Sequence, residues 1–339
     1  MSAASDCVVG WDIGGAHLKA VAIDATRRLR ACRILPCPLW QGMERLEQAF
    51  AAALAALPVT PRAHALTMTG EGCDLFADRA EGVARILDTA ARALAPQGWR
   101  VYADDGGLVA RAAPARIASM NWHATGRALG AVLPDALLVD LGSTTADVTL
   151  VRDGEVRTIG RDDRERLARD ELVYQGIART PVMALAQRVP YRGAWQGMAA
   201  EYFATMADVY RVLGELPEGA DLMPSADGRP KTARDSAARL ARMVGDDFDA
   251  TREAAVVELA AWLRSAQLAR LRAAVLRVCA ESPARVVVGA GVGRFLVREL
   301  AISLGLAYRD YAEALGIAEA EAANDCAPAL ALACLELGA

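Results

Sequence analysis

One short pattern occurs twice in the chain and constrains the fold more than any other feature. An apolar strand, an aspartate, an apolar residue, a glycine and a small residue follow one another at 9–15 and again at 138–144. In both places the following residues have the pattern of a returning strand. Together with a Gly-x-Gly-x-Gly turn at 289–293, the two copies indicate two related α/β halves that face one another across a cleft.

The length and the order of the predicted elements agree with two halves. A chain of 339 residues is long enough for about two domains, each with a core of its own. Strand and helix patterns alternate through the first 152 residues, which is typical of α/β proteins. There we predict strands at 7–11, 18–24, 63–68, 100–103, 136–140 and 147–152, and helices at 43–57, 79–94 and 122–133.

The rest of the chain is mostly helical in pattern. We predict helices at 196–213, 234–244 and 253–279, then a buried strand at 285–288 and a helix that runs through 302. Residues 216–231 are rich in proline and glycine and form a predicted surface loop, either a lid over the site or a plain solvated turn. We place one half at 1–133 and the other at 134–339, with a helical insertion at about 160–283.

Charge and cysteine content exclude several classes of protein. Lysine and arginine number 38 against 42 acidic residues, so no positive field over the whole chain attracts nucleic acid or an anionic membrane. The seven cysteines never occur in C-x-x-C spacing, which argues against a zinc site or a disulfide framework. No apolar stretch approaches the length of a membrane span, and we expect a soluble, cytoplasmic protein.

The glycine turns are the predicted binding elements. A glycine turn after a strand lets backbone N–H groups converge on an anion, because no Cβ blocks the approach and positive φ angles are accessible. Hydroxyl groups beside the second turn add further hydrogen-bond donors. The residues predicted to bind phosphate groups are Gly14, Gly15, Gly142, Ser143, Thr144, Thr145, Gly289, Gly291 and Gly293.

Two aspartates and one lysine accompany these turns. Asp12 and Asp140 end the two facing strands, where carboxylates commonly hold Mg²⁺ against a phosphate, usually through water. The alternative is that each aspartate caps its own turn. Lys19 follows the first turn and could reach back to a phosphate oxygen, or could be a solvated lysine of a hairpin. We therefore expect Mg²⁺ and a phosphate-bearing ligand in the cleft.

The three turns resemble the phosphate-1, phosphate-2 and adenosine motifs of the superfamily of acetate and sugar kinases, heat-shock chaperones and actin. That resemblance implies an α/β fold of two ribonuclease-H-like halves around a central cleft. Nearly the whole chain also resembles the hydantoinase/oxoprolinase-type proteins of tetrahydromethanopterin-linked C1 metabolism, the methanofuran-pathway synthases. The segments that carry this second resemblance lie at 12–19, 67–71, 79–83, 119–122, 171–182 and 201–204.

The second resemblance implies a transferase. Such a synthase joins an aminomethyl-furan-methyl diphosphate to the phenol of γ-glutamyl-tyramine, or of a tyramine-like acceptor, and releases diphosphate as the ether forms. Two glycine turns, a lysine and Mg²⁺ could stabilise the charge that develops on the departing diphosphate. ATP is a possible ligand but is not expected to be required, and a homodimer is possible.

The acceptor phenol must lose a proton, and the candidate bases are Glu71, Asp208 and His17. Lys19 and Arg179 are the candidates for holding anionic groups of the substrates. The further candidates for an arginine clamp or an aromatic slot are Arg166, Arg192, Trp122, Tyr174 and Tyr202, each of which could equally be structural.

Three other functions stay open at this point. An ATP-dependent kinase of a small metabolite would keep the fold and the Mg²⁺ but needs a carboxylate on the acceptor hydroxyl. An ATP-driven hydantoinase or oxoprolinase is usually a longer chain or works with a second subunit. A nucleotide-gated sensor or scaffold would be accompanied by an interaction domain, and no such segment is visible in the sequence.

Overall fold

The computed structural model describes residues 7–58, 60–95, 97–280, 282–318 and 320–338. Its first sheet has the strand order β3-β2-β1-β4-β5-β6. Strand β1 pairs antiparallel with β2 and parallel with β4. The strands are β1 (Cys7–Ile13), β2 (His17–Asp24), β3 (Leu29–Pro36), β4 (Ala63–Met68), β5 (Gly98–Tyr102) and β6 (Leu108–Val109).

The second sheet repeats this arrangement. Its order is β10-β8-β7-β13-β14, with β9 paired to β8, and β7 pairs antiparallel with β8 and parallel with β13. The strands are β7 (Ala136–Leu141), β8 (Ala146–Arg152), β9 (Glu155–Val156), β10 (Leu172–Val173), β13 (Val286–Ala290) and β14 (Ala307–Asp310). A matching antiparallel hairpin followed by parallel strands in each half confirms the predicted pair of ribonuclease-H-like halves.

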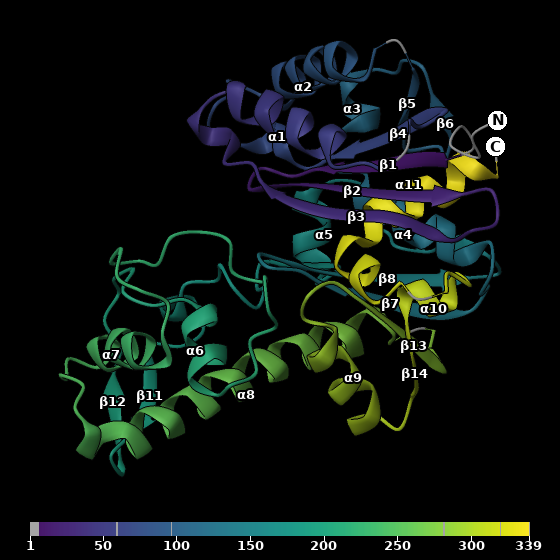
Figure 1. Cartoon of the computed structure of the whole chain (residues 1–339). Coiled ribbons are helices and arrows are strands. Elements are labelled where there is room, and N and C mark those ends of the chain that lie inside the picture. Colours follow the sequence, from purple (N-terminus) through teal and green to yellow (C-terminus); the bar gives the residue numbers. More distant parts are fainter. Residues whose placement is uncertain (1–6, 59, 96, 281, 319, 339) are drawn as a thin grey trace.

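Helices α4 (Asn121–Gly130) and α11 (Ala327–Leu337) pack against each other between the two sheets, as Figure 1 shows. Helix α11 crosses β1 so closely that a Cβ at Gly10 would lie 1.9 Å from the carbonyl oxygen of Ala329. Only glycine fits there, and its small size lets the last helix of the chain pack directly against the first strand. The outer helices are α1 (Glu44–Ala55), α2 (Arg79–Leu94) and α3 (Pro114–Ile117) on the first half, and α9 (Arg294–Ser303) and α10 (Tyr311–Ala314) on the second.

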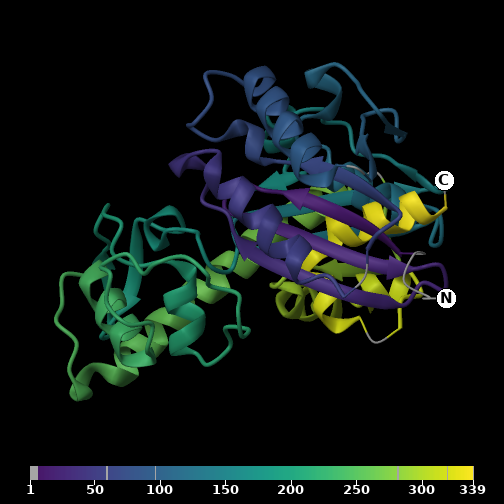
Figure 2. The same cartoon turned by 45° about the horizontal axis from the view of Figure 1, so that its top comes forward.

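The insertion forms a lobe beside the two sheets, joined to them by the long helix α8, and it stays apart in both views (Figures 1 and 2). It contains the hairpin β11 (Arg188–Tyr191) and β12 (Ala194–Gly197), and the helices α6 (Met206–Val212), α7 (Ala233–Met243) and α8 (Glu253–Val278). Residues 216–231 have no helix or strand, as predicted.

The predicted helix at 196–213 is wrong over its first ten residues. Residues 194–197 pair with β11 as a strand, and α6 begins only at Met206. Thr205 caps α6, because its side chain accepts from the amide of Asp208 while the Asp208 side chain accepts from the amide of Thr205. That cap sets the start of the helix, whereas the apolar residues before it pack without helical structure.

Short elements complete the chain and position the site. They are α5 (Asp163–Arg169) and the 3₁₀ helices η1 (Leu39–Gln41), η2 (Gly70–Gly72), η3 (Val182–Ala184), η4 (Ala250–Arg252) and η5 (Glu321–Cys326). Within the part of the chain that the structure describes, none of the helices combines the length and the apolar character needed to cross a lipid bilayer.

Candidate functional site

A cleft of about 540 Å³ lies between the two halves. Both predicted phosphate turns line it, the β1–β2 turn from one side and the β7–β8 turn from the other. The predicted site residues that line the cleft are Asp12, Gly14, Gly15, Lys19, Asp140, Gly142, Ser143, Thr144, Thr145 and Arg179. Those that do not are Glu71, Asp208, Gly289, Gly291 and Gly293.

The two turns are closed in the same way. The amide of Gly14 donates to the carbonyl of His17 at 2.9 Å, and the amide of Gly142 donates to the carbonyl of Thr145 at 2.8 Å. The next amides, at Gly15 in one turn and at Ser143 and Thr144 in the other, donate to no group among the described residues. Unbonded N–H groups on glycine turns are donors of the kind that bind anions.

Acidic side chains and one lysine share the floor of the cleft. Asp12 lies directly across from Lys19 in the β1–β2 register. Burial raises the pKa of Asp12, and its Oδ1 has no hydrogen-bond partner among the described residues. Burial lowers the pKa of Lys19, but Asp12 and the neighbouring acids outweigh it, so that pKa is raised and the ammonium stays charged. Burial also raises the pKa of Asp140 to about 7.

Asp147 is a site residue that the sequence analysis missed. It pairs with Asp140 in the β7–β8 register, just as Lys19 pairs with Asp12 in the first half. Asp147 lines the cleft and accepts from Arg166 at 2.8 Å. The sequence spacing could have indicated this residue, because Asp147 follows Asp140 at the same interval at which Lys19 follows Asp12.

The donor set of this floor fits Mg²⁺ held mainly through water. Mg²⁺ in enzymes commonly takes one or two carboxylates and keeps several waters and substrate phosphate oxygens. Asp12 and Asp140 would supply those carboxylates, and burial raises the pKa of each. Among the described residues, no group of three or more acidic, histidine or cysteine side chains is placed to hold a metal ion, so a Mg²⁺ ion here would need water and ligand oxygens as well.

The arginines near the cleft have distinct environments. Arg179 donates to the Thr144 hydroxyl at 3.3 Å and lies 5.6 Å from the centre of the Trp40 ring, which belongs to the other half. Arg166 is buried against the Trp122 ring at 4.0 Å and is paired with Asp147, so it supports the cleft wall. Arg192 lies in the β11–β12 turn near Asp246 and does not line the cleft.

The predicted aromatic candidates also differ in whether they line the cleft. Tyr174 is exposed and lines the cleft. Trp122 is buried beneath Arg166, and Tyr202 is half exposed but outside the cleft lining. Tyr174 and Trp40 are therefore the aromatic side chains at this cleft.

The third glycine turn does not open into the cleft. The amide of Gly291 donates to the carbonyl of Asn324 at 2.8 Å, and the amide of Gly293 donates to the carbonyl of Leu141 at 2.8 Å. A Cβ at Gly291 would lie 2.5 Å from Asp140 Oδ1, and one at Gly289 would lie 2.3 Å from the Tyr308 hydroxyl oxygen. These glycines therefore allow close packing behind Asp140 rather than exposing N–H groups to a ligand.

Glu71 lies behind the cleft wall. Its Oε1 accepts from the Ser119 hydroxyl at 2.7 Å and from Arg79 at 3.3 Å, while its Oε2 has no partner among the described residues. A Cβ at Gly82 would come within 2.4 Å of the Glu71 carbonyl oxygen, so α2 packs directly on this segment. Burial raises the pKa of Glu71. Ser119, Arg79 and Asp163 line the cleft in front of it.

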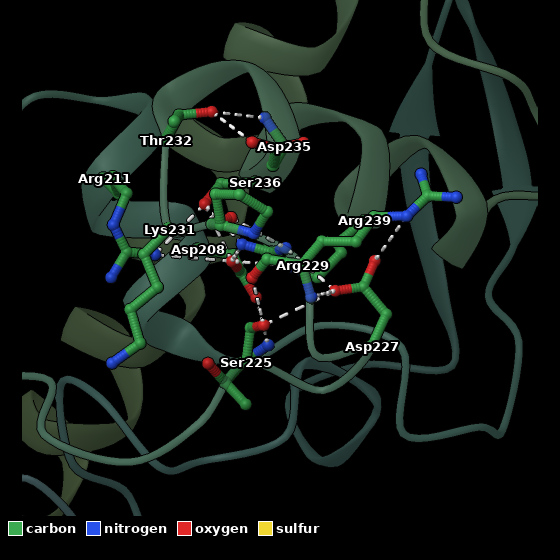
Figure 3. Close-up of polar contacts among 12 residues, drawn as sticks. Asp208, Arg211, Ser225, Asp227, Arg229, Lys231, Thr232, Asp235, Ser236 and Arg239 are labelled. Atoms are coloured by element: carbon green, nitrogen blue, oxygen red, sulfur yellow. Dashed lines mark hydrogen bonds and ion pairs between the residues drawn. The ribbon is translucent and has the colours of Figure 1, made fainter.

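Asp208 lies in the insertion, in the network that Figure 3 shows. Its Oδ1 accepts from Ser236 at 2.8 Å and from Arg239 at 2.8 Å, and its Oδ2 caps α6. The same network holds the 216–231 loop, because Arg239 also pairs with Asp227 at 3.1 Å. Lys231, in turn, donates to the carbonyl of Asp221 at 2.7 Å. The loop is anchored in the insertion, and neither Asp208 nor Lys231 lines the cleft.

His17 is the third predicted base and lines the cleft. Burial, together with the positive charges of Lys19 and Arg179, lowers its pKa to about 4. The ring is therefore neutral near neutral pH and is a poor place to leave a proton. Of the three candidates, Glu71 has the environment best suited to accept one.

The two α/β halves and the cleft between them define a two-lobed protein with the actin-like and sugar-kinase-like fold. The model of the hydantoinase/oxoprolinase family matches residues 62–333, and the chain belongs to that family. A synthase of Methanocaldococcus jannaschii is 28% identical over 86% of this chain and 88% of its own length. Its name is (4-{4-[2-(γ-L-glutamylamino)ethyl]phenoxymethyl}furan-2-yl)methanamine synthase.

A protein of Methanococcus vannielii with the same name is 32% identical over 34% of this chain and 51% of its own length. Among solved structures, nucleotide-free acetone carboxylase superposes with a TM-score of 0.53 at 13% identity. The superposition covers 96% of this chain and 70% of that one, and it shows a shared fold.

Proposed function

We propose that the protein is a transferase of methanofuran-type biosynthesis. It condenses an aminomethyl-furan-methyl diphosphate with the phenol of γ-glutamyl-tyramine, or a close analogue, to give an aryl ether and diphosphate. The product in the name of the M. jannaschii relative is such an ether between a phenol and a furan-methyl carbon. The sequence similarity over most of both chains supports the same class of reaction here.

The observation that carries the proposal is the contrast among the three glycine turns. Two turns offer free amides to the cleft, with Lys19 and the carboxylates between them, which suits a diphosphate. The third turn, at the position of an adenosine motif, does not line the cleft, and its Gly291 and Gly293 amides donate to the carbonyls of Asn324 and Leu141. Arg294, next to this turn, forms ion pairs with Asp325, Glu321 and Asp310. This arrangement favours a diphosphate substrate over ATP.

The predicted site residues of the cleft have the following roles in this reaction. The amides of the two turns and Lys19 bind the diphosphate and stabilise the negative charge that grows on it as the carbon–oxygen bond breaks. Asp12 and Asp140 would hold Mg²⁺, which when bound supplies positive charge to the leaving group. Arg179, fixed on the second turn by Thr144, adds a guanidinium for a diphosphate or carboxylate oxygen.

The direct test is the reaction itself. Purified protein with Mg²⁺, the furan-methyl diphosphate and γ-glutamyl-tyramine, without ATP, is expected to give the ether by mass spectrometry and diphosphate by phosphate assay. If no ether forms without ATP but the protein turns over ATP with a metabolite panel, the kinase or hydrolase reading replaces this one.

The two lysines of the chain provide a matched pair of variants. Lys19→Met is expected to lower kcat/KM by about 10³-fold or more, because the leaving diphosphate loses a charge partner in a buried site. Lys231→Met removes a lysine of the insertion and is expected to keep the wild-type rate. Near-normal turnover in Lys19→Met, with the fold intact by circular dichroism, would remove Lys19 from the mechanism.

A further inference from the structure

Ser119 combines unusual backbone geometry with a place at the cleft. Its φ is 54°, in the left-handed region that non-glycine residues rarely adopt. It lies two residues after the end of α3 and begins the 119–122 segment, and it lines the cleft although the residue is buried. Backbone strain of this kind is concentrated at functional sites.

The hydrogen bonds of that hydroxyl leave one position open. A serine hydroxyl has one proton to donate and two lone pairs that accept. Ser119 donates to Glu71 Oε1 at 2.7 Å, and Arg79 donates to Ser119 at 2.8 Å. The Asp163 carboxylate is a more distant acceptor at 3.4 Å and is itself paired with Arg79. One lone pair of Ser119 is thus left for a donor in the cleft.

Glu71 depends on Ser119 to reach the substrate. The Glu71 side chain is fully buried and does not line the cleft, whereas Ser119 does. Arg79 covers the same face by donating to both groups. The Ser119 hydroxyl therefore links Glu71 to the cleft.

We propose that Ser119 is a catalytic residue that accepts a hydrogen bond from the acceptor phenol and relays the phenol proton to Glu71. This inference rests on the proposed ether-forming reaction and assigns the step that its acceptor must undergo. Ser119 touches the substrate and Glu71 holds the proton, while Arg79 keeps the hydroxyl oriented.

The step balances without any further reagent. The phenol oxygen forms a bond to the furan-methyl carbon, and the bond from that carbon to the diphosphate oxygen breaks, with the electron pair leaving on diphosphate. The phenol proton passes to Ser119 Oγ while the Ser119 proton passes to Glu71 Oε1. The neutral Glu71 then returns its proton through the same hydroxyl to water as the products leave.

The test compares two acceptors and two substitutions. Ser119→Ala removes the hydroxyl, and Ser119→Gly does so while fitting the left-handed backbone, which keeps the test valid if the alanine variant folds poorly. The acceptors are γ-glutamyl-tyramine and its ring-difluorinated analogue, whose more acidic phenol needs less help to lose its proton. Ser265→Ala is the matched control, because that serine is exposed on α8 and bonds only to the Ala261 carbonyl.

With the ordinary acceptor, we expect kcat of both Ser119 variants to fall about 10²-fold, and with the fluorinated acceptor to stay within about fivefold of wild type. Ser265→Ala should match wild type with both. Equal losses with both acceptors, or no loss in folded Ser119 variants, would overturn the relay while leaving the ether synthesis in place. Absence of ether from the wild-type protein would instead overturn the proposed function, and the relay with it.

Discussion

Glu71 and Asp208 are buried to nearly the same degree, at 1% and 3% exposure, but the structure surrounds them very differently. Both carboxylate oxygens of Asp208 have partners, from a helix cap, a serine and an arginine, in the network that Figure 3 shows. Glu71 has one oxygen paired and one without a partner among the described residues. The paired oxygen of Glu71 is one hydroxyl away from the cleft.

The comparison shows that burial alone does not distinguish a reactive carboxylate from a structural one. Asp208 joins α6, α7 and the 216–231 loop, and its charge is matched by buried Arg239. Such a carboxylate is fully engaged in holding the insertion together and does not line the cleft. Glu71 keeps a carboxylate oxygen without a partner among the described residues, behind a polar wall of the cleft. An unpaired buried oxygen costs stability, as is common at active sites.

The largest effect that tests this contrast is expected at Glu71. Glu71→Gln keeps the shape and the hydrogen bond to Ser119 but removes the proton acceptor, so kcat for ether formation should fall about 10³-fold. The melting temperature should stay close to wild type or rise, because an incompletely paired buried charge has been removed. Steady-state kinetics and thermal unfolding measure both, and a folded Glu71→Gln enzyme of normal rate would contradict the assignment.

Asp208→Asn should give the opposite pattern. The neutral side chain leaves the buried Arg239 without one of its two carboxylates, and we expect a loss of about 3 kcal/mol in the free energy of unfolding. At a temperature where the variant is folded, kcat should stay within about threefold of wild type. Urea unfolding and the ether assay separate the two readouts, and a large loss of kcat with normal stability would place Asp208 in the reaction.

Much of this fold is predictable from sequence because its signals are local. Each strand–glycine–strand hairpin is set by apolar residues and a turn that only a few residue types allow, so Gly14 and Gly142 mark both hairpins correctly. The start of α6 was mispredicted because apolar spacing continues through residues that pack without helical structure. The cap of Thr205 with Asp208 decides that boundary.

The site was predictable only where neighbours in sequence are neighbours in space. Asp12 and Lys19 face each other across one hairpin, so sequence placed them together. The closure of the third turn depends on the carbonyls of Asn324 and Leu141, which come from distant segments. The importance of Ser119 depends on a positive φ and on the distant Glu71 and Arg79, which no local pattern reveals.

His64 gives the smallest expected effect and tests the contrast between Glu71 and Asp208 from a third position. Like Glu71, it has a buried atom without a partner among the described residues, but it lies away from the cleft. Its Nδ1 accepts from the Trp11 indole at 3.1 Å, and its Nε2 has no partner among the described residues. Burial lowers the His64 pKa from 6.5 to about 4, so the unfolded chain binds a proton in this range and the folded chain does not. Stability is therefore fully present above about pH 6.5 and is lost as the pH falls toward 4.

His64→Asn keeps an acceptor for Trp11 but has no proton to bind, so it should lose less stability on acidification. Acidification from about pH 7 to about pH 4.5 should lower the free energy of unfolding of the wild type by about 2 kcal/mol more than that of the variant. Turnover should be unaffected, because an unpartnered buried atom gives a reactive group only where a chain of hydrogen bonds connects it to the cleft. Urea unfolding at both pH values with a parallel ether assay tests this, and a loss of turnover in a folded His64→Asn enzyme would break that rule.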